Sequence, residues 1–187
     1  LCAAAPLLPG MTVLLQGGGG VSLFALQFAK LFGARVIIIS SSPERCARLK
    51  SMGADETIDY QAEPEWNTAV RKLTGGEADI AVEAIGNPKT MEAAFNGLRG
   101  GGRLIVLGYA DAVLPLPAGR IMFREMEVMG SLGCRPADYP RIVELARTGK
   151  IRLKELVTQR FRLSEIGKAL DLLRGGGDGA LRSIVIP

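Results

Sequence analysis

The sequence predicts an α/β fold: a doubly wound, six-stranded parallel sheet followed by a short C-terminal α+β segment. Short β-branched and aliphatic runs alternate with amphipathic stretches of roughly 10 to 15 residues, a pattern typical of βαβ units. Glycine or proline stands at the ends of most of these stretches. The chain has 187 residues, of which 48% are hydrophobic and 22% charged, so it can bury a substantial core.

Six short apolar runs are predicted to form the parallel sheet. Right-handed crossovers between such strands place the intervening helices on both faces of the sheet. The predicted strands are Thr12–Gln16, Arg35–Ser40, Glu56–Asp59, Asp79–Ala84, Arg103–Leu107 and Glu127–Met129.

The stretches between the strands predict helices with recognisable ends. Apolar residues recur at helical spacing over Val21–Phe32, and Gly33 ends that helix. Ser42 is the predicted N-cap of the next helix, which has Pro43 in its first turn and runs to Met52. Two more helices begin with proline, and glycines are predicted to break the chain after each: Pro64–Thr74 before the glycines at 75–76, and Pro88–Leu98 before those at 100–102.

The pattern changes after about Leu132 and no longer resembles simple βαβ units. We therefore divide the chain into residues 1–132 and residues 133–187. The elements predicted in the second part are a helix at Ala137–Thr148, extended pieces near Lys154–Arg162, a helix capped by Ser164 and ending at Arg174, a turn at Gly175–Gly179, and a last strand at Arg182–Ile186.

Charge and composition limit the classes of partner. The 23 Lys and Arg against 19 Asp and Glu give a net charge of +4, and the basic residues are scattered, which favours small anionic ligands over nucleic acid. The chain has no histidine, which argues against a catalytic metal site of its own. Its cysteines, Cys2, Cys46 and Cys134, lack CxxC spacing and predict neither disulfides nor a zinc knuckle.

No apolar run approaches the roughly 20 residues that span a bilayer, and no export signal is visible at the start of the sequence. We therefore expect a cytoplasmic protein without a membrane partner.

Four consecutive glycines, Gly17–Gly20, follow the first predicted strand and precede the first predicted helix. With Val21 and Ser22 they occupy the position of the GxGxxG dinucleotide fingerprint, Ser22 replacing the third glycine. The first glycine permits a tight turn, the second lets a pyrophosphate approach the backbone, and the helix N-terminus offers N–H groups to that anion. A Rossmann dinucleotide site is therefore predicted, although an ordinary glycine-rich βα loop would show the same four residues.

The end of the second predicted strand indicates which dinucleotide is preferred. An NAD site usually has Asp or Glu there, whereas this chain has Ser40, Ser41 and Ser42, with Arg45 one turn on. Hydroxyl donors and a guanidinium suit a 2′-phosphate, so NADP(H) is predicted, with NAD(H) possible. The serines could instead serve only to cap the helix. The missing acid also argues against an S-adenosylmethionine methyltransferase.

Longer stretches resemble the cofactor domain of medium-chain dehydrogenase/reductases, the zinc-type alcohol dehydrogenase and quinone oxidoreductase superfamily. These stretches cover nearly the whole chain: "LPGMTVLLQGGGGVSLFALQFAKLFGARVIIISSSPERCARLKSMGADETIDY", "ADIAVEAIGNPKTM", "GGRLIVLGYA" and "FRLSEIGKALDLLRGGGDGALRSIVIP". The resemblance implies a Rossmann domain followed by a return of the chain into a catalytic domain. That GroES-like domain, with any zinc ligands, is expected to lie upstream of Leu1.

The resemblance also implies roles for individual residues. Gly17, Gly19, Gly20 and Val21 would hold the pyrophosphate, and Ser40, Ser41 and Arg45 the adenosine ribose and its phosphate. Ile85, Gly86 and Asn87 would border the adenine side, Leu107, Gly108 and Tyr109 would approach the nicotinamide, and Arg182 would reach the cofactor phosphates.

We therefore expect the cofactor-binding part of an NADP(H)-dependent oxidoreductase that moves a hydride between NADPH and a small alcohol, carbonyl or activated alkene. Because no acid/base set is evident, the chain alone is expected to be inactive. The alternative is a non-catalytic dinucleotide-binding or redox-sensing module. The family resemblance also implies a homodimer that pairs sheets through Glu127–Met129.

Overall fold

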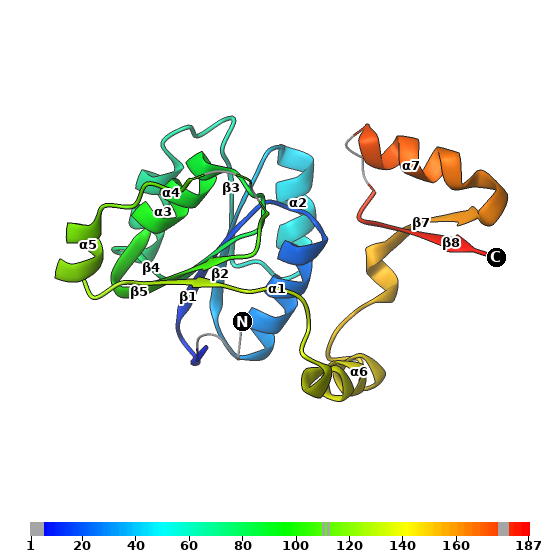
Figure 1. The fold of residues 1–187 in the computed structure, drawn as a ribbon, viewed down its shortest axis with the longest axis horizontal. Coiled ribbons are helices and arrows are strands. Elements are labelled where there is room, and N and C mark those ends of the chain that lie inside the picture. The colour runs from blue at the N-terminus through cyan, green and yellow to red at the C-terminus, as the bar shows by residue number, and fades with distance from the viewer. Residues whose placement is uncertain (1–5, 110, 112, 176–179) are drawn as a thin grey trace. The chain divides into compact units, whose positions relative to one another are not determined.

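The computed structural model describes residues 6–109, 111, 113–175 and 180–187 (Figure 1). Cys2 and residues 176–179 of the predicted C-terminal turn lie outside the described residues. The chain forms two compact units, Leu1–Cys134 and Arg135–Pro187.

The first unit contains a six-stranded sheet in which every neighbouring pair of strands is parallel. The strand order is β3-β2-β1-β4-β5-β6, which confirms the predicted Rossmann fold class. The strands are β1 (Thr12–Gln16), β2 (Arg35–Ser40), β3 (Glu56–Asp59), β4 (Ala78–Glu83), β5 (Leu98–Val106) and β6 (Glu127–Gly130).

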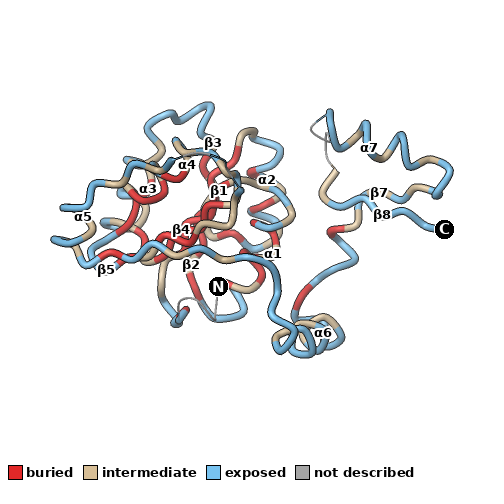
Figure 2. The backbone as a smooth tube through the Cα atoms, viewed as in Figure 1, coloured by how far each residue is buried: buried red, intermediate tan, exposed pale blue. Residues whose placement is uncertain are grey.

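Helices cover both faces of this sheet (Figure 1). They are α1 (Gly20–Leu31), α2 (Pro43–Ser51), α3 (Trp66–Thr74), α4 (Pro88–Asn96) and α5 (Ala118–Phe123). Buried residues are concentrated in the strands and on the inner sides of α1, α2, α3 and α4 (Figure 2). On the face covered by α3 and α4, for example, Leu14 packs in one cluster with Val70 and Phe95. This burial holds the carboxyl ends of the strands, where the predicted site residues lie, in fixed positions.

One prediction for the first unit is wrong, and one helix was missed. The glycines at 100–102 do not break the chain but lie inside β5, where Gly101 has a φ of +67° and its N–H donates to the Arg124 carbonyl oxygen at 2.7 Å. They accompany a shift in the pairing of β4 with β5 between Ala78 and Ile80, a local irregularity that glycine favours. Helix α5 was not predicted, because six residues are too few for a clear helical period.

The second unit consists of a 3₁₀ turn (Pro136–Asp138), α6 (Tyr139–Arg147), a second 3₁₀ turn (Lys154–Leu156), β7 (Val157–Arg162), a third 3₁₀ turn (Leu163–Glu165), α7 (Ile166–Arg174) and β8 (Arg182–Ile186). Strands β7 and β8 pair in parallel as a separate sheet. The predicted cap by Ser164 is wrong: Ser164 lies within the third 3₁₀ turn, and the Glu165 carboxylate accepts from the Arg162 N–H at 3.2 Å instead.

None of the helices within residues 6–175 and 180–187 combines the length and the apolar content needed to cross a membrane.

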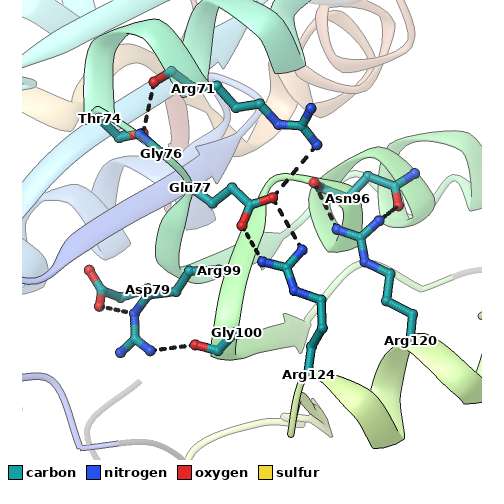
Figure 3. Close-up of polar contacts among 10 residues, drawn as sticks. All are labelled: Arg71, Thr74, Gly76, Glu77, Asp79, Asn96, Arg99, Gly100, Arg120 and Arg124. Carbon is teal, nitrogen blue, oxygen red and sulfur yellow. Dashed lines mark hydrogen bonds and ion pairs between the residues drawn. The ribbon is translucent and has the colours of Figure 1, made fainter.

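A charged cluster joins α3, β4 and α5 on the first unit (Figure 3). Glu77, which precedes β4, pairs with Arg124 after α5 and with Arg71 of α3, whose Nη2 lies 3.6 Å from Glu77 Oε1. Arg120 of α5 points instead at Asn96, 2.7 Å from its Oδ1, and lies over the Phe95 ring. Because only 16% of the Glu77 side chain is exposed, water screens this cluster less than it screens a surface pair.

We expect Glu77→Gln to lower the free energy of unfolding at neutral pH by about 1–2 kcal/mol, since a half-buried, charge-assisted hydrogen bond is lost. The hydrogen bond from Arg124 holds the pKa of the Glu77 carboxyl below its usual value of about 4.3, against the opposing effect of burial. A carboxyl whose pKa is lower in the folded state stabilises the fold above the unfolded-state pKa. This contribution is lost as the pH falls through the folded-state pKa.

Urea unfolding at pH 7 and near pH 3 checks this expectation: the difference between the two proteins should shrink at the lower pH. Glu56→Gln is the matched control, because its more exposed pair with Lys50 should contribute less. An equal loss at both pH values would contradict the assignment.

Candidate functional site

The turn between β1 and α1 lies at the carboxyl edge of the sheet. Gly17 has a φ of +86°, which glycine adopts without strain, and its N–H donates to the Ile39 carbonyl oxygen at 2.8 Å. Ser22, at the position of the third fingerprint glycine, is buried, and its Oγ donates to the Gln16 carbonyl oxygen at 3.0 Å. The serine thus fastens the start of α1 to the end of β1.

The N-terminal end of α1 is open to a ligand. The helix begins at Gly20, as the fingerprint predicts, with Gly19 as N-cap. Gly19 makes no side-chain cap, and the first turn contains no acidic residue. A Cβ at Gly19 would meet no described atom within 4 Å, and the neighbouring Val21 is 47% exposed. N–H groups at a helix N-terminus that lack a cap bind anions, and space for one is present here.

Gly18 has a packing role that the fingerprint does not predict. A Cβ on Gly18 would lie 3.1 Å from Ser40 Oγ at the end of β2 and 3.5 Å from Leu49 Cδ1 of α2. Ser40 is only 1% exposed, and its Oγ has no hydrogen-bond partner among the described residues. A buried hydroxyl without a partner normally indicates a missing ligand or water. The Ser40 hydroxyl is therefore available to form a hydrogen bond with a ligand beside the glycine turn.

The start of α2 carries the other residues predicted for the ribose phosphate. Ser42 caps the helix as predicted, since its side chain accepts from the Arg45 N–H at 3.3 Å. The Arg45 Nη1 donates to Ser41 Oγ at 3.2 Å, which brings these two site residues together. Glu44 was missed: its own backbone N–H and the Ser42 hydroxyl hold the pKa of its carboxyl below the usual value, so a negative charge lies beside the serines.

The loops after β4 and β5 contact each other on the opposite side of the glycine turn from Ser40. Ile85 is 48% exposed, and its Cγ1 would lie 3.3 Å from a Cβ on Gly17. Gly86 has a φ of +83°, and a Cβ there would overlap the Tyr109 carbonyl oxygen. A Cβ on Gly108 would likewise overlap the Gly86 nitrogen. The backbones of the two loops therefore touch without space for a side chain between them.

Of the four remaining predicted site residues, three belong to these loops and one lies in the second unit. Asn87 is exposed and caps α4, accepting from the Lys89 N–H at 2.9 Å. Leu107 is half-buried and Tyr109 is 89% exposed. Arg182 is exposed at the first residue of β8, in the second unit.

Glu83 is a second site residue that the sequence analysis missed. It ends β4, is 0% exposed, and its carboxylate accepts from the N–H groups of Ile85 at 2.9 Å and Gly86 at 3.0 Å. The Thr90 hydroxyl on α4 also donates to it at 2.9 Å. A carboxylate that follows the apolar run Ile80–Val82, just before Ala-Ile-Gly-Asn, was the available sequence signal.

No group of three or more His, Cys, Asp or Glu among the described residues could hold a metal ion. Cys46 is buried and Cys134 is exposed. The described residues therefore do not fit a zinc ion.

A family model described as zinc-binding dehydrogenase matches residues 20–148, which is more than half of the chain. The chain belongs to the zinc-binding dehydrogenase family. Sorbitol dehydrogenase of Bacillus subtilis (strain 168) is 31% identical to it over 189 residues, which cover 99% of this chain and 53% of the relative. The chain thus spans about half the length of the curated relatives it matches.

Solved structures of this family have the same fold. One described as a zinc-binding dehydrogenase from Sinorhizobium meliloti 1021, bound to NADP, is 26% identical with a TM-score of 0.84 and covers 99% of this chain and 54% of its own. A structure described as an NAD-dependent alcohol dehydrogenase is 34% identical with a TM-score of 0.81 and covers 90% of this chain and 49% of its own. Within the zinc-binding dehydrogenases, the chain corresponds to the dinucleotide-binding domain.

Proposed function

We propose that the chain binds NADP(H) across the carboxyl edge of its six-stranded sheet. The observation that carries this proposal is the open N-terminal end of α1, where Gly19 makes no side-chain cap and leaves space above its Cα. Gly17, Gly19, Gly20 and Val21 would surround the pyrophosphate, whose negative charge the N–H groups of the first turn would stabilise.

The two halves of the dinucleotide would extend in opposite directions from this turn. The adenosine ribose would lie against Ser40, whose buried Oγ has no partner among the described residues, and its 2′-phosphate against Ser41 and Arg45. The nicotinamide would lie toward Gly108 and Tyr109. Ile85–Asn87, expected from the family resemblance on the adenine side, are here assigned to the nicotinamide half, because Ile85 adjoins Gly17 and Gly86 adjoins Tyr109.

The preference for NADP(H) over NAD(H) is proposed from the absence of a carboxylate at Ser40, Ser41 and Ser42 and from the exposed guanidinium of Arg45. A guanidinium forms charge-assisted, bidentate hydrogen bonds with a phosphate. Glu44 works against this preference, because its negative charge lies on the same helix turn. Of the two solved structures described above, one is bound to NADP and the other is described as NAD-dependent, so together they favour neither cofactor for this chain.

We expect Arg45→Ala to weaken NADPH binding about tenfold while leaving NADH binding unchanged, since only NADPH carries the 2′-phosphate. Titration of each dinucleotide, followed by nicotinamide fluorescence, measures both affinities. Lys50→Ala is the matched control: it removes one positive charge at the other end of α2, where Lys50 pairs with Glu56. Glu44→Gln should act oppositely to Arg45→Ala and tighten NADPH binding.

Equal binding of NADPH and NADH by the unmodified chain would contradict the cofactor preference. Absence of binding of both would contradict the proposed function itself.

We further propose that the chain acts as the cofactor domain of a longer oxidoreductase on a small alcohol, carbonyl or activated alkene. The bound nicotinamide would supply or accept the hydride. The chain contains no histidine, so a proton relay and any zinc would have to come from residues beyond this sequence, and the chain alone is proposed to be inactive.

A homodimer is proposed from the family resemblance. The candidate interface is β6, the edge strand of the six-stranded sheet, in which all residues but Met129 are exposed.

A further inference from the structure

We infer that Glu83 is a positioning residue that fixes the loops after β4 and β5 against each other and thereby shapes the nicotinamide side of the site. This inference rests on the proposed dinucleotide binding. It concerns a residue that would itself contact neither the pyrophosphate nor the ribose in the arrangement proposed above.

The side chain of Glu83 fixes the first loop. Its carboxylate is fully buried and accepts the consecutive N–H groups of Ile85 and Gly86, the latter at 3.0 and 3.1 Å from its two oxygens. The Thr90 hydroxyl, in the first turn of α4, lies 2.9 Å from the same carboxylate and 2.8 Å from the Asn87 carbonyl oxygen, and its one proton is shared between these two acceptors. Each bond to an ionised acceptor is stronger than a bond between neutral groups, and the buried charge would be costly without these donors.

The backbone of Glu83 fixes the second loop. Its carbonyl oxygen accepts from the N–H groups of Leu107 at 2.8 Å and Gly108 at 3.0 Å. One residue therefore holds both loops, and we call this arrangement the Glu83 clamp.

The close approach of Gly86 and Gly108 explains why such a clamp is needed. A Cβ on Gly108 would lie 2.6 Å from Glu83 Oε2 as well as overlapping Gly86, so the two backbones and the carboxylate fill one confined space. Loops in this degree of contact cannot move independently, because interiors are close-packed. Loss of the carboxylate would leave two partly buried N–H groups without their acceptor and would free Gly86 to move against Tyr109.

The location of the clamp confines its effect to one half of the ligand. Strands β4 and β5 lie on one side of β1, and β2, with Ser40, lies on the other. Displacement of the Glu83 clamp should therefore disturb the nicotinamide half and leave the adenosine half in place.

The test compares Glu83→Met, which removes both carboxylate oxygens at similar size, with Glu83→Gln, which keeps one acceptor oxygen. We expect Glu83→Met to weaken NADPH binding more than about tenfold and Glu83→Gln to give an intermediate loss. Affinity for adenosine 2′,5′-bisphosphate, which carries only the adenosine side, should stay unchanged in both. A purely structural role would change both affinities or neither.

Two further variants keep the test decisive if Glu83→Met fails to fold. Thr90→Val removes one donor to the carboxylate and should cause a smaller, selective loss of NADPH affinity. Asp79→Asn is the matched control: Asp79 is also a carboxylate of β4, but it accepts from Thr12 N and Arg99 Nε at the other end of the strand. It should leave NADPH affinity unchanged.

Amide hydrogen exchange tests the Glu83 clamp without any ligand. A failure of the clamp inference can therefore be distinguished from a failure of the proposed dinucleotide binding. In Glu83→Met, which keeps no carboxylate oxygen, the N–H groups of Ile85 and Gly86 should exchange faster, while those of β1 should not. Unchanged exchange at both residues, or equal losses of affinity for NADPH and for adenosine 2′,5′-bisphosphate, would overturn the inference. Absence of NADPH binding by the unmodified chain would overturn only its relation to the cofactor.

Discussion

Gly86→Ala is expected to lower the free energy of unfolding by about 3–5 kcal/mol, the sum of backbone strain and steric overlap. The φ of +83° at Gly86 disfavours any residue with a Cβ, and that Cβ would overlap the Tyr109 carbonyl oxygen and lie 2.9 Å from its carbonyl carbon. Neither group is the end of a flexible side chain that could rotate away. The loop after β5 would have to shift, so dinucleotide binding should also weaken at least about tenfold.

Two glycine controls separate the causes of this loss. Gly75 also has a positive φ, +70°, but a Cβ there would meet no described atom within 4 Å, so Gly75→Ala should cost only about 1–2 kcal/mol from backbone strain. Gly119 lies in α5 with open space around it, and Gly119→Ala should be neutral or slightly stabilising. Urea unfolding measures all three. A loss for Gly86→Ala no larger than that for Gly75→Ala would contradict the close approach of the two loops.

The regular elements of this fold could be predicted because local signals and burial agree. Ser42 and Pro43 begin α2 both in the sequence pattern and in the structure, where the Ser42 side chain accepts from Arg45 N–H. The aliphatic residues of β2 are buried on both faces of the sheet, as the continuous apolar run predicts.

The prediction was wrong where a local signal had two meanings. Three consecutive glycines normally end an element, but those at 100–102 accompany an irregularity inside β5, where tertiary contact with Arg124 decides the conformation. Ser164 carries a common capping side chain, yet the Glu165 carboxylate supplies the hydrogen bond at that turn. Sequence alone does not tell which of two competing hydrogen-bond acceptors is closer.

The sequence predicts the glycine turn of the site but not the residues that position the turn and the neighbouring loops. The fingerprint locates Gly17 and the start of α1, because strand, turn and helix are contiguous in the chain. It leaves Gly18 unexplained, since the contact of that residue with Ser40 joins positions 22 residues apart. Glu83 was missed for the same reason: its importance depends on Gly108, which reaches it only through the pairing of β4 with β5.

Gly19→Ala is expected to separate binding from stability. Gly19 has a φ of −80°, which any residue adopts, and a Cβ there would meet no described atom, so the loss of unfolding free energy should stay at about 1 kcal/mol or less, as for other N-cap changes. The methyl group would, however, occupy the space through which a phosphate must approach the backbone N–H groups. Dinucleotide affinity should therefore fall about 10- to 100-fold.

Gly33→Ala, at the other end of the same helix, is the reciprocal control. Gly33 has a φ of +75°, so alanine should cost about 1–2 kcal/mol of unfolding free energy, but it lies beside Pro9 and away from the site. Its dinucleotide affinity should equal that of the unmodified chain. Urea unfolding and fluorescence titration measure the two effects. Gly19→Ala should lose mainly dinucleotide affinity, and Gly33→Ala should lose mainly unfolding free energy. Full binding by Gly19→Ala would mean that the open N-terminal end of α1 does not receive the pyrophosphate.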